Sequence, residues 1–238
     1  MTPTQVYRFP PLLEGILIKR YKRFMADIEL ASGDIITAHC PNTGPMTGVC
    51  HINGRVMVSQ SNNPKRKLAY TWELAEVNDN GPTWVGVNTA LPNRVIQAAL
   101  TEHIFEQLGP YDTIKREVPY GTKSRIDFLL TTDKRPIYIE VKNYTWAQGR
   151  LCLFPDTVTT RGQKHLREMT ALLPDARAVM LYFINRGDCD QFAPGDNADP
   201  DYGQLLRSAI AAGIEVLPCR FEISPTSINY IGQAKLMV

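Results

Sequence analysis

Short runs of apolar and β-branched residues, separated by turn-forming residues, dominate the first third of the chain. They cover residues 15–30, 33–40, 54–61 and 67–77, and each is bounded by Gly, Pro, Asn or Asp. Several short strands at this spacing are typical of a small barrel or sandwich. The pattern therefore predicts an all-β domain in this part of the chain.

The periodicity changes from that of strands to that of a helix after residue 90. Ile96, Leu100, Ile104 and Leu108 recur at every fourth position, and Gly109 follows as a helix stop. This spacing places the apolar side chains on one face of a helix, so it predicts a helix over residues 91–109. The next runs are strand-like and cover residues 111–120, 124–130 and 136–143.

Two further helices are predicted in the remainder. Residues 159–173 have an apolar stripe, and Thr160 and Gln163 have the spacing of a capping box. Residues 176–185 are nearly all apolar, which is typical of a strand buried on both faces. Residues 199–213 begin with Asp-Pro and end in Gly, which indicates a helix.

A last strand-like run at residues 214–221 completes the order α-β-β-β-α-β-α-β. This order predicts an α/β domain with a mixed sheet. The change of pattern places a boundary near residues 82–88. We therefore expect an α/β protein overall, with an all-β domain in residues 1–84 and the α/β domain in residues 85–238.

Composition narrows the class of protein. The chain has 238 residues, 44% of them apolar and 21% charged, as is typical of a soluble globular protein. No apolar run is long enough to span a bilayer, and the N-terminal residues lack the pattern of a secretory signal. The five cysteines have no framework spacing, which indicates reduced thiols. We expect a cytoplasmic protein without a membrane partner.

Positive charge gathers in two clusters of the first third, although the net charge is only +2. Residues 1–81 carry 9 Lys and Arg against 7 Asp and Glu, and the remainder carries 17 of each. Cations mixed with aromatic side chains favour nucleic acid strands, although a solvated strand face and a charged loop give the same pattern. The candidate nucleic-acid-binding residues are Lys19, Arg20, Lys22, Arg23, Lys65, Arg66, Lys67, Tyr70 and Trp72.

Ionised residues interrupt two neighbouring predicted strands. Side chains alternate along a strand, so Glu140 and Lys142 share one face of the second strand. If the two strands pair across the turn between them, Asp127 of the first strand lies beside Glu140 on that face. A slip of one residue in the register would put Asp127 on the opposite face.

Two adjacent carboxylates raise each other's pKa unless a cation neutralises them. Lys142 offsets only one of the two charges, whereas a divalent cation such as Mg²⁺ offsets both and keeps several waters. Bound Mg²⁺ or Mn²⁺ activates water and stabilises a transferring phosphoryl group, and the lysine can act on that water. Asp127 and Glu140 are therefore the candidate metal ligands. An ion-pair ladder on an exposed sheet face is the alternative.

An acid on one strand and Glu-x-Lys on the next resemble the motif of the PD-(D/E)xK nuclease superfamily. On this resemblance the candidate catalytic residues are Asp127, Glu140 and Lys142. The superfamily has a glutamate on the preceding helix, where this chain has Gln97. Glu106 or Glu117 would then supply a third acid, and we favour Glu117 because it lies on a strand that leads into the site.

Longer segments extend the resemblance over nearly the whole chain. "FPPLLEGILIKRYKRFMADIEL", "HCPNTGPMTG" and "FPDTVTTRGQKHLREM" are similar to the sugar fermentation stimulation protein A (SfsA) family. The resemblance implies an OB-fold-like domain in residues 1–84 and a PD-(D/E)xK nuclease-like domain in residues 85–238. It also implies binding of DNA without strong sequence preference, and it adds Arg161 and Lys164 of the second helix as phosphate contacts.

Two functions remain open at this point. The first is a divalent-metal-dependent nuclease that acts on single- or double-stranded DNA, which the retained Asp127, Glu140 and Lys142 favour. The second is a non-catalytic DNA-binding regulatory factor linked to sugar (maltose) metabolism, which Gln97 and the small net charge favour. The sequence allows a dimer and does not distinguish DNA from RNA.

One other motif contains residue types that bind zinc. His39, Cys40, Cys50 and His51 are two adjacent pairs of zinc-ligand types. Adjacent residues of a strand point to opposite faces, so the pairs lack the spacing of a tetrahedral site. We interpret residues 40–44 as a loop that lies near a phosphate.

Overall fold

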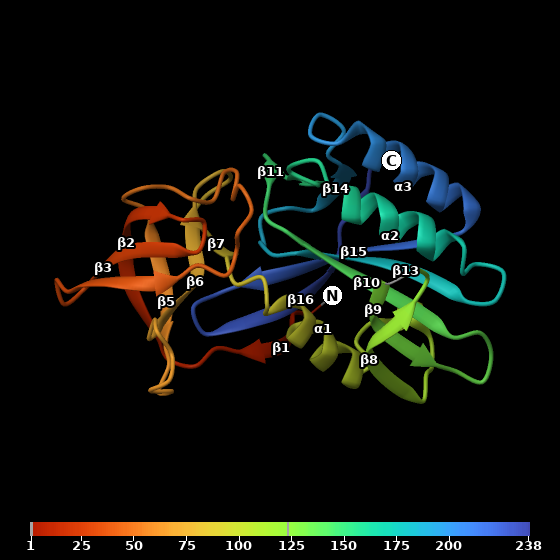
Figure 1. Cartoon of the computed structure of the whole chain (residues 1–238), viewed down its shortest axis with the longest axis horizontal. Helices are drawn as coiled ribbons and strands as arrows, with labels where there is room; N and C mark the ends of the chain where they lie inside the picture. Colours follow the sequence, from red (N-terminus) through yellow and green to blue (C-terminus); the bar gives the residue numbers. More distant parts are fainter. Residues whose placement is uncertain (1, 123) are drawn as a thin grey trace.

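The computed structural model describes residues 2–122 and 124–238, and it consists of a barrel beside a larger α/β domain (Figure 1). The barrel sheet has the order β4-β3-β2-β5-β6-β7, and β4 also pairs with β6, so five strands close into a barrel. The all-β, OB-like domain predicted from the sequence is confirmed. Its strands are β2 (Leu12–Tyr21), β3 (Met25–Leu30), β4 (Ile35–His39), β5 (Arg55–Gln60), β6 (Tyr70–Val77) and β7 (Thr83–Gly86).

The second domain is built on a seven-stranded mixed sheet with the order β1-β16-β15-β13-β10-β9-β8. The central strands β10, β13 and β15 are parallel, and the outer strands on both sides pair antiparallel. The predicted α/β fold with a mixed sheet is confirmed. The strands are β1 (Thr4–Arg8), β8 (Thr113–Tyr120), β9 (Ser124–Thr131), β10 (Ile137–Tyr144), β13 (Arg177–Ile184), β15 (Glu215–Ile223) and β16 (Ser227–Gln233).

Helices cover both faces of this sheet. Figure 1 shows α1 (Pro92–Thr101) on one face, and α2 (Thr160–Thr170) and α3 (Pro200–Ala212) together on the other. No helix among the described residues is long and apolar enough to cross a membrane. A small sheet lies at one end of the domain and contains β11 (Ala147–Gln148), β12 (Leu151–Phe154), β14 (Gln191–Pro194) and β17 (Lys235–Leu236).

The first helix is shorter than the sequence predicts. It ends at Thr101 instead of running to Gly109, and a short 3-10 helix, η1 (Glu106–Leu108), follows. His103 takes a left-handed backbone conformation with φ of 50°, and the N–H of Ile104 donates to the carbonyl of Ala99. Helices that end in this conformation usually have glycine at this position. Here the residue is His103, so the sequence carries no signal for the end of the helix.

Of the other two predicted helix starts, that of α3 is confirmed and that of α2 differs in its capping residue. The N-cap of α2 is Thr159, whose hydroxyl accepts from the N–H of Gly162, so the capping box predicted for Thr160 and Gln163 is wrong. The side chain of Asp199 caps α3 as expected, and Gly213 ends that helix in the left-handed conformation.

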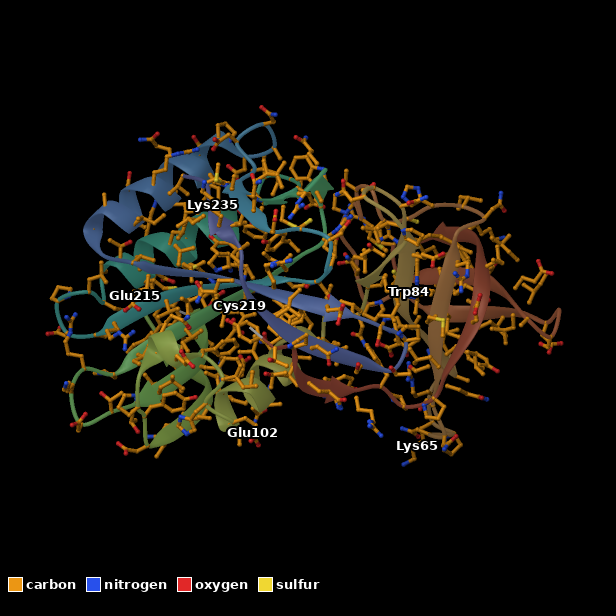
Figure 2. All side chains as sticks on the ribbon, turned by 180° about the vertical axis from the view of Figure 1, so that it is seen from behind. Lys65, Trp84, Glu102, Glu215, Cys219 and Lys235 are labelled. Carbon is orange, nitrogen blue, oxygen red and sulfur yellow. The ribbon has the colours of Figure 1, made fainter. Side chains whose placement is uncertain are left out.

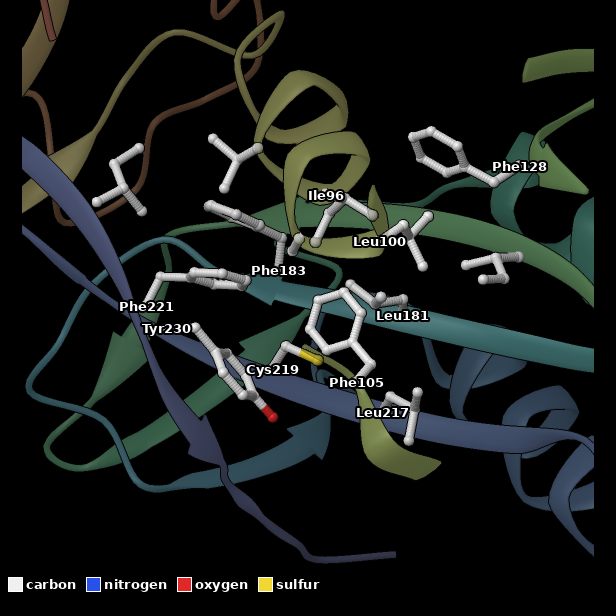
Figure 3. Close-up of a cluster of buried hydrophobic side chains, with 14 of the residues drawn as sticks. Ile96, Leu100, Phe105, Phe128, Leu181, Phe183, Leu217, Cys219, Phe221 and Tyr230 are labelled. Atoms are coloured by element: carbon white, nitrogen blue, oxygen red, sulfur yellow. The ribbon is translucent and has the colours of Figure 1, made fainter. Parts of the chain in front are cut away.

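A buried cluster of apolar residues joins α1 to the sheet and to the barrel (Figure 3). Phe183 and Phe221 stack in it with ring centroids 4.1 Å apart. Met57 and Leu74 of the barrel strands belong to the same cluster. The two domains therefore share part of one hydrophobic core, and burial of this apolar surface stabilises their relative position.

The N-terminal strand corrects the predicted domain division. Residues Thr4–Arg8 form β1 and pair with β16 of the second domain, although the division at residue 84 assigns them to the barrel (Figure 1). The chain thus begins in the second sheet, builds the barrel and returns. The partner strand β16 is close to the other end of the chain, so no local pattern signals the pairing.

Polar contacts fix the junction between the domains. Arg186 is almost completely buried, and its Nη2 lies 2.6 Å from Asp79 Oδ2 and 2.7 Å from Asp188 Oδ2. The backbone N–H of Gly86 donates to the carbonyl of Asn185. Asp79 follows the barrel strand β6, so this ion-pair network connects the barrel with the end of β13.

Candidate active site

The charged residues singled out from the sequence meet where β9 and β10 separate. The two strands pair antiparallel from Ile137↔Leu130 to Ile139↔Phe128, and their ladder then stops. Continued by one pair, this register places Glu140 opposite Asp127. β10 instead continues beside β13 as far as Tyr144. The register is therefore the one assumed from the sequence, and the ladder ends at the position of the two acids.

Asp127 is held by two donors. Its Oδ2 accepts a hydrogen bond from the backbone N–H of Val141 at 2.8 Å, and its Oδ1 accepts from the side-chain amide of Asn93 at 2.7 Å. Burial and the nearby charge of Glu140 raise the pKa of the Asp127 carboxyl to about 6. The carboxylate is thus oriented by the protein but still carries an unfavourable charge near neutral pH.

Glu140 is buried and shares one oxygen between two partners. Lys142 Nζ donates to Glu140 Oε1 at 2.7 Å, and Nδ1 of His165 contacts the same oxygen. Burial raises the pKa of Glu140, but the hydrogen bond with His165 and the charge of Lys142 outweigh it and lower the pKa overall. The other oxygen, Oε2, is buried and has no hydrogen-bond partner among the described residues.

The second helix brings His165 to Glu140. His165 is buried on α2, and its Nδ1 lies 3.4 Å from Lys142 Nζ. The start of α2 is anchored because Gln163 Nε2 donates to the buried carboxylate of Asp199, at 3.0 and 3.1 Å from its two oxygens. Sequence reasoning missed this contact of His165 with Glu140.

A hollow of about 630 Å³ opens beside this group. Most of the side chains that line it are polar or cationic, and His165 connects it with Glu140. Lys164 already has two partners in the protein. Its Nζ donates a hydrogen bond to the carbonyl of Thr122 and lies 3.5 Å from the carboxylate of Glu168. The lining residues are Glu117, Ser124, Arg125, Thr160, Arg161, Lys164 and His165.

Glu117, the favoured third acid, lines the same hollow. The pairs Arg116↔Phe128 and Val118↔Ile126 place it opposite Asp127 in the β8–β9 register. Its side chain is exposed, and its backbone has a φ of 51°, which is unusual for a residue other than glycine. The structure therefore brings Glu117 to the edge of the site.

On the first helix, the residue that reaches Asp127 is Asn93 and not Gln97. Gln97 lies one turn later, and its side-chain oxygen accepts from Arg116 Nη1 at 2.8 Å. Glu106 lies beyond the helix in η1. Sequence reasoning missed Asn93 because a short polar side chain in the first turn of a helix usually indicates only a cap.

The first basic cluster lies in the hairpin between β2 and β3. Lys19 Nζ is 3.2 Å from Asp27 Oδ2, and Arg20 Nη2 donates to three backbone carbonyls at 2.9 Å each. Lys22 and Arg23 are exposed at the turn, with φ of 48° and 65°. Of these four cations, Lys22 and Arg23 are the ones freely presented to a ligand.

The second basic cluster is a loop on a different part of the barrel. Lys65, Arg66 and Lys67 are exposed, and Figure 2 shows Lys65 at the lower edge of the barrel. Tyr70 is half-buried. Trp72 is completely buried and donates to the carbonyl of Leu74, so its prediction as a base-stacking residue is wrong.

Asp127 and Glu140 offer two carboxylates to a metal. Within residues 2–122 and 124–238, no group of three or more His, Cys, Asp and Glu side chains is close enough to hold a metal by itself. Mg²⁺ needs only one or two carboxylates because it keeps several waters. Oε2 of Glu140 has no hydrogen-bond partner among the described residues. The raised pKa of Asp127 indicates that the protein does not neutralise the charge of this carboxylate. Both features fit a bound Mg²⁺.

Comparisons with known proteins agree with this architecture. The family described as "SfsA N-terminal OB domain" matches residues 18–87, and the one described as "Sugar fermentation stimulation protein RE domain" matches residues 90–227. A solved structure of Pyrococcus furiosus SfsA is similar with a TM-score of 0.88 and 24% identity, and the match covers 99% of this chain and 100% of that chain.

Curated relatives are more similar in sequence. A sugar fermentation stimulation protein homolog of Synechococcus elongatus is 70% identical over 236 residues, which is 99% of this chain and 100% of the relative. A homolog of Nostoc sp. is 65% identical over 237 residues, which is 98% of each chain. The chain therefore belongs to the sugar fermentation stimulation protein (SfsA) family.

Proposed function

We propose that this protein binds DNA strands without strong sequence preference and hydrolyses their phosphodiester bonds with Mg²⁺ or Mn²⁺. The observation that carries the proposal is the placement of Asp127 opposite Glu140 where β9 and β10 separate. Lys142 donates a hydrogen bond to the carboxylate of Glu140 at the same position. Two carboxylates this close favour a second cation besides the lysine. The unpartnered oxygen of Glu140 is available to that cation.

Asp127 and Glu140 would hold the metal, and the backbone carbonyl of Val141 would assist them. The bound cation would lower the pKa of a water and neutralise charge on the phosphoryl group. Support comes from the Pyrococcus furiosus relative, whose structure was solved in complex with Ca²⁺. Ca²⁺ and Mg²⁺ both prefer oxygen ligands, so the relative makes a divalent cation a reasonable partner for this chain.

The remaining residues have distinct tasks in the proposal. The ammonium of Lys142 orients the attacking water or binds the scissile phosphate as a point charge. His165 positions Glu140, because it contacts Oε1 and leaves Oε2 free. Arg125, Arg161 and Lys164 line the hollow and attract the phosphate backbone.

The test is cleavage of end-labelled single-stranded DNA, double-stranded DNA and RNA in Mg²⁺, Mn²⁺ or EDTA, with binding measured in parallel. Cutting that needs the metal and stops in EDTA supports the proposal. Binding without cutting in any metal contradicts the hydrolytic part and leaves a DNA-binding regulatory factor on a nuclease scaffold.

One observation favours this second candidate, the DNA-binding regulatory factor. Asn93 and Gln97 on the first helix are amides, which bring no negative charge to a metal.

A further inference from the structure

A second polar hollow, of about 380 Å³, lies where the barrel meets the second domain. Five of its lining residues come from the β2–β3 hairpin and from the loop after β4, and one comes from the segment before α2. Figure 1 shows α2 starting on the side of its domain that faces the barrel. The lining residues are Arg20, Arg23, Thr43, Gly44, Pro45 and Thr157.

Arg20 brings a charge without a carboxylate partner to this hollow. Its Nη2 donates to the carbonyls of Arg23, Asn42 and Gly44, and its Nε is buried with no hydrogen-bond partner within the described ranges. No ion pair of Arg20 exists among the described residues. The half-buried guanidinium of Arg20 therefore leaves a positive charge without an anion beside the hollow, which makes the hollow electrostatically complementary to an anion.

The other groups suit one anion in particular. Arg23 is exposed at the hairpin turn, and no described residue forms an ion pair with it. Thr43 and Thr157 supply hydroxyl donors from the two domains. Guanidinium groups with hydroxyls around them match the oxygens of a phosphate, because charge-assisted hydrogen bonds to these oxygens are short and strong.

We propose that this hollow is a phosphate subsite that holds a backbone phosphate of the strand bound at Asp127 and Glu140. Thr157 lies three residues before Thr160, which lines the hollow beside the candidate active site. The two hollows therefore flank one short segment at the start of α2, and a strand that crosses it contacts both. The inference rests on the proposed function, because a nucleic acid strand is its ligand.

The test measures affinity for a fluorescein-labelled single-stranded oligonucleotide by anisotropy, in Ca²⁺ and over a series of salt concentrations. Arg23→Gln should weaken binding about tenfold, because it removes a charge-assisted contact. It should also make the salt dependence shallower by about 0.7 in logarithmic slope, the value for one phosphate contact to a single strand. Thr157→Val should weaken binding less.

Lys134→Gln is the matched control, since it removes one exposed charge from the turn between β9 and β10. It should change neither affinity nor salt slope. Equal affinity and slope for wild type and Arg23→Gln, with thermal unfolding unchanged, would overturn the subsite and leave the proposed function standing. Failure of the wild type to bind any oligonucleotide would overturn both.

A calorimetric titration with inorganic phosphate separates the two sources of the anion. Phosphate should compete with the oligonucleotide for the wild type, and Arg23→Gln should lose that competition. If Arg23→Gln loses phosphate binding but keeps full oligonucleotide affinity, the hollow serves a free phosphate compound, and its assignment to the strand is wrong.

Discussion

The carboxylate of Asp127 accepts a hydrogen bond from the backbone N–H of Val141, with 2.8 Å between the nitrogen and Oδ2. The bond lies just beyond the last pair of the β9–β10 ladder, Ile139↔Phe128, so a side chain replaces a backbone partner there. The position of the acid is therefore set by the main chain of β10. Its charge can be removed while the strands keep their register.

The raised pKa of Asp127 predicts a dependence of stability on pH. The pKa in the folded protein is about 6 against 3.8 for the free group, so the folded state holds this proton more tightly. The carboxyl stabilises the fold fully below about pH 4 and loses that contribution as the pH rises through about 6, by at most about 3 kcal/mol.

Urea unfolding of wild type and Asp127→Asn at about pH 5 and about pH 7.5 checks this prediction. The free energy of unfolding of the wild type should decrease between these pH values more than that of the variant. Asp196→Asn is a control, because Asp196 lies in an exposed pair with Arg207. Identical pH profiles for wild type and Asp127→Asn would show that the carboxyl is not perturbed by its surroundings.

A divalent cation should stabilise the folded protein. Mn²⁺ neutralises the repulsion between Asp127 and Glu140, so it should raise Tm at neutral pH and do so less below about pH 6, where a proton competes for Asp127. Glu140→Gln should abolish the rise, and Glu168→Gln should keep it. A Tm of the wild type that does not respond to Mn²⁺ would mean that the two acids do not hold a metal.

The buried Arg186 should be essential for the junction of the domains. Arg186→Met leaves Asp188, which is 7% exposed, without its cation, so unfolding in urea should require about 3–5 kcal/mol less. Arg207→Met removes an exposed pair with Asp196 and should change the free energy by less than about 1 kcal/mol. Similar losses for the two variants would show that Arg186 contributes no more than a surface ion pair.

Glu117 can be tested as a third acid with two substitutions. Glu117→Gly relieves the φ of 51° and should stabilise the fold by up to about 1 kcal/mol, whereas Glu117→Gln keeps the backbone as it is. Both variants should cut DNA more slowly if the carboxylate acts in the reaction. If both variants cut DNA at the rate of the wild type, Glu117 takes no part in the reaction and only shapes the backbone of β8.

The order of the elements and the central part of the site could be predicted from the sequence. Alternating apolar residues define the faces of β9 and β10, and since one face of each is buried, the register of Asp127 and Glu140 follows. Trp72 follows a basic loop in the sequence but is buried in the barrel core. Proximity in sequence to a charged loop does not decide which face a strand residue takes.

Features that depend on distant contacts could not be predicted. Asn93 and His165 reach the carboxylates only because α1 and α2 pack on opposite faces of the same sheet. The pairing of β1 with β16 joins the two ends of the chain, and His103 ends α1 in a conformation that its residue type does not indicate. Each of these is decided by tertiary packing and leaves no periodic signal.

The most direct test of the account is the single-turnover rate of DNA cleavage in Mn²⁺ for wild type and Lys142→Met, with Lys134→Met as control. Lys142→Met should bind Mn²⁺ and DNA but cut about 10²- to 10⁴-fold more slowly, because the group that acts on the attacking water is gone. Lys134→Met should cut like wild type. Equal rates for wild type and Lys142→Met, or no cutting by wild type, would contradict a nuclease built on Asp127, Glu140 and Lys142.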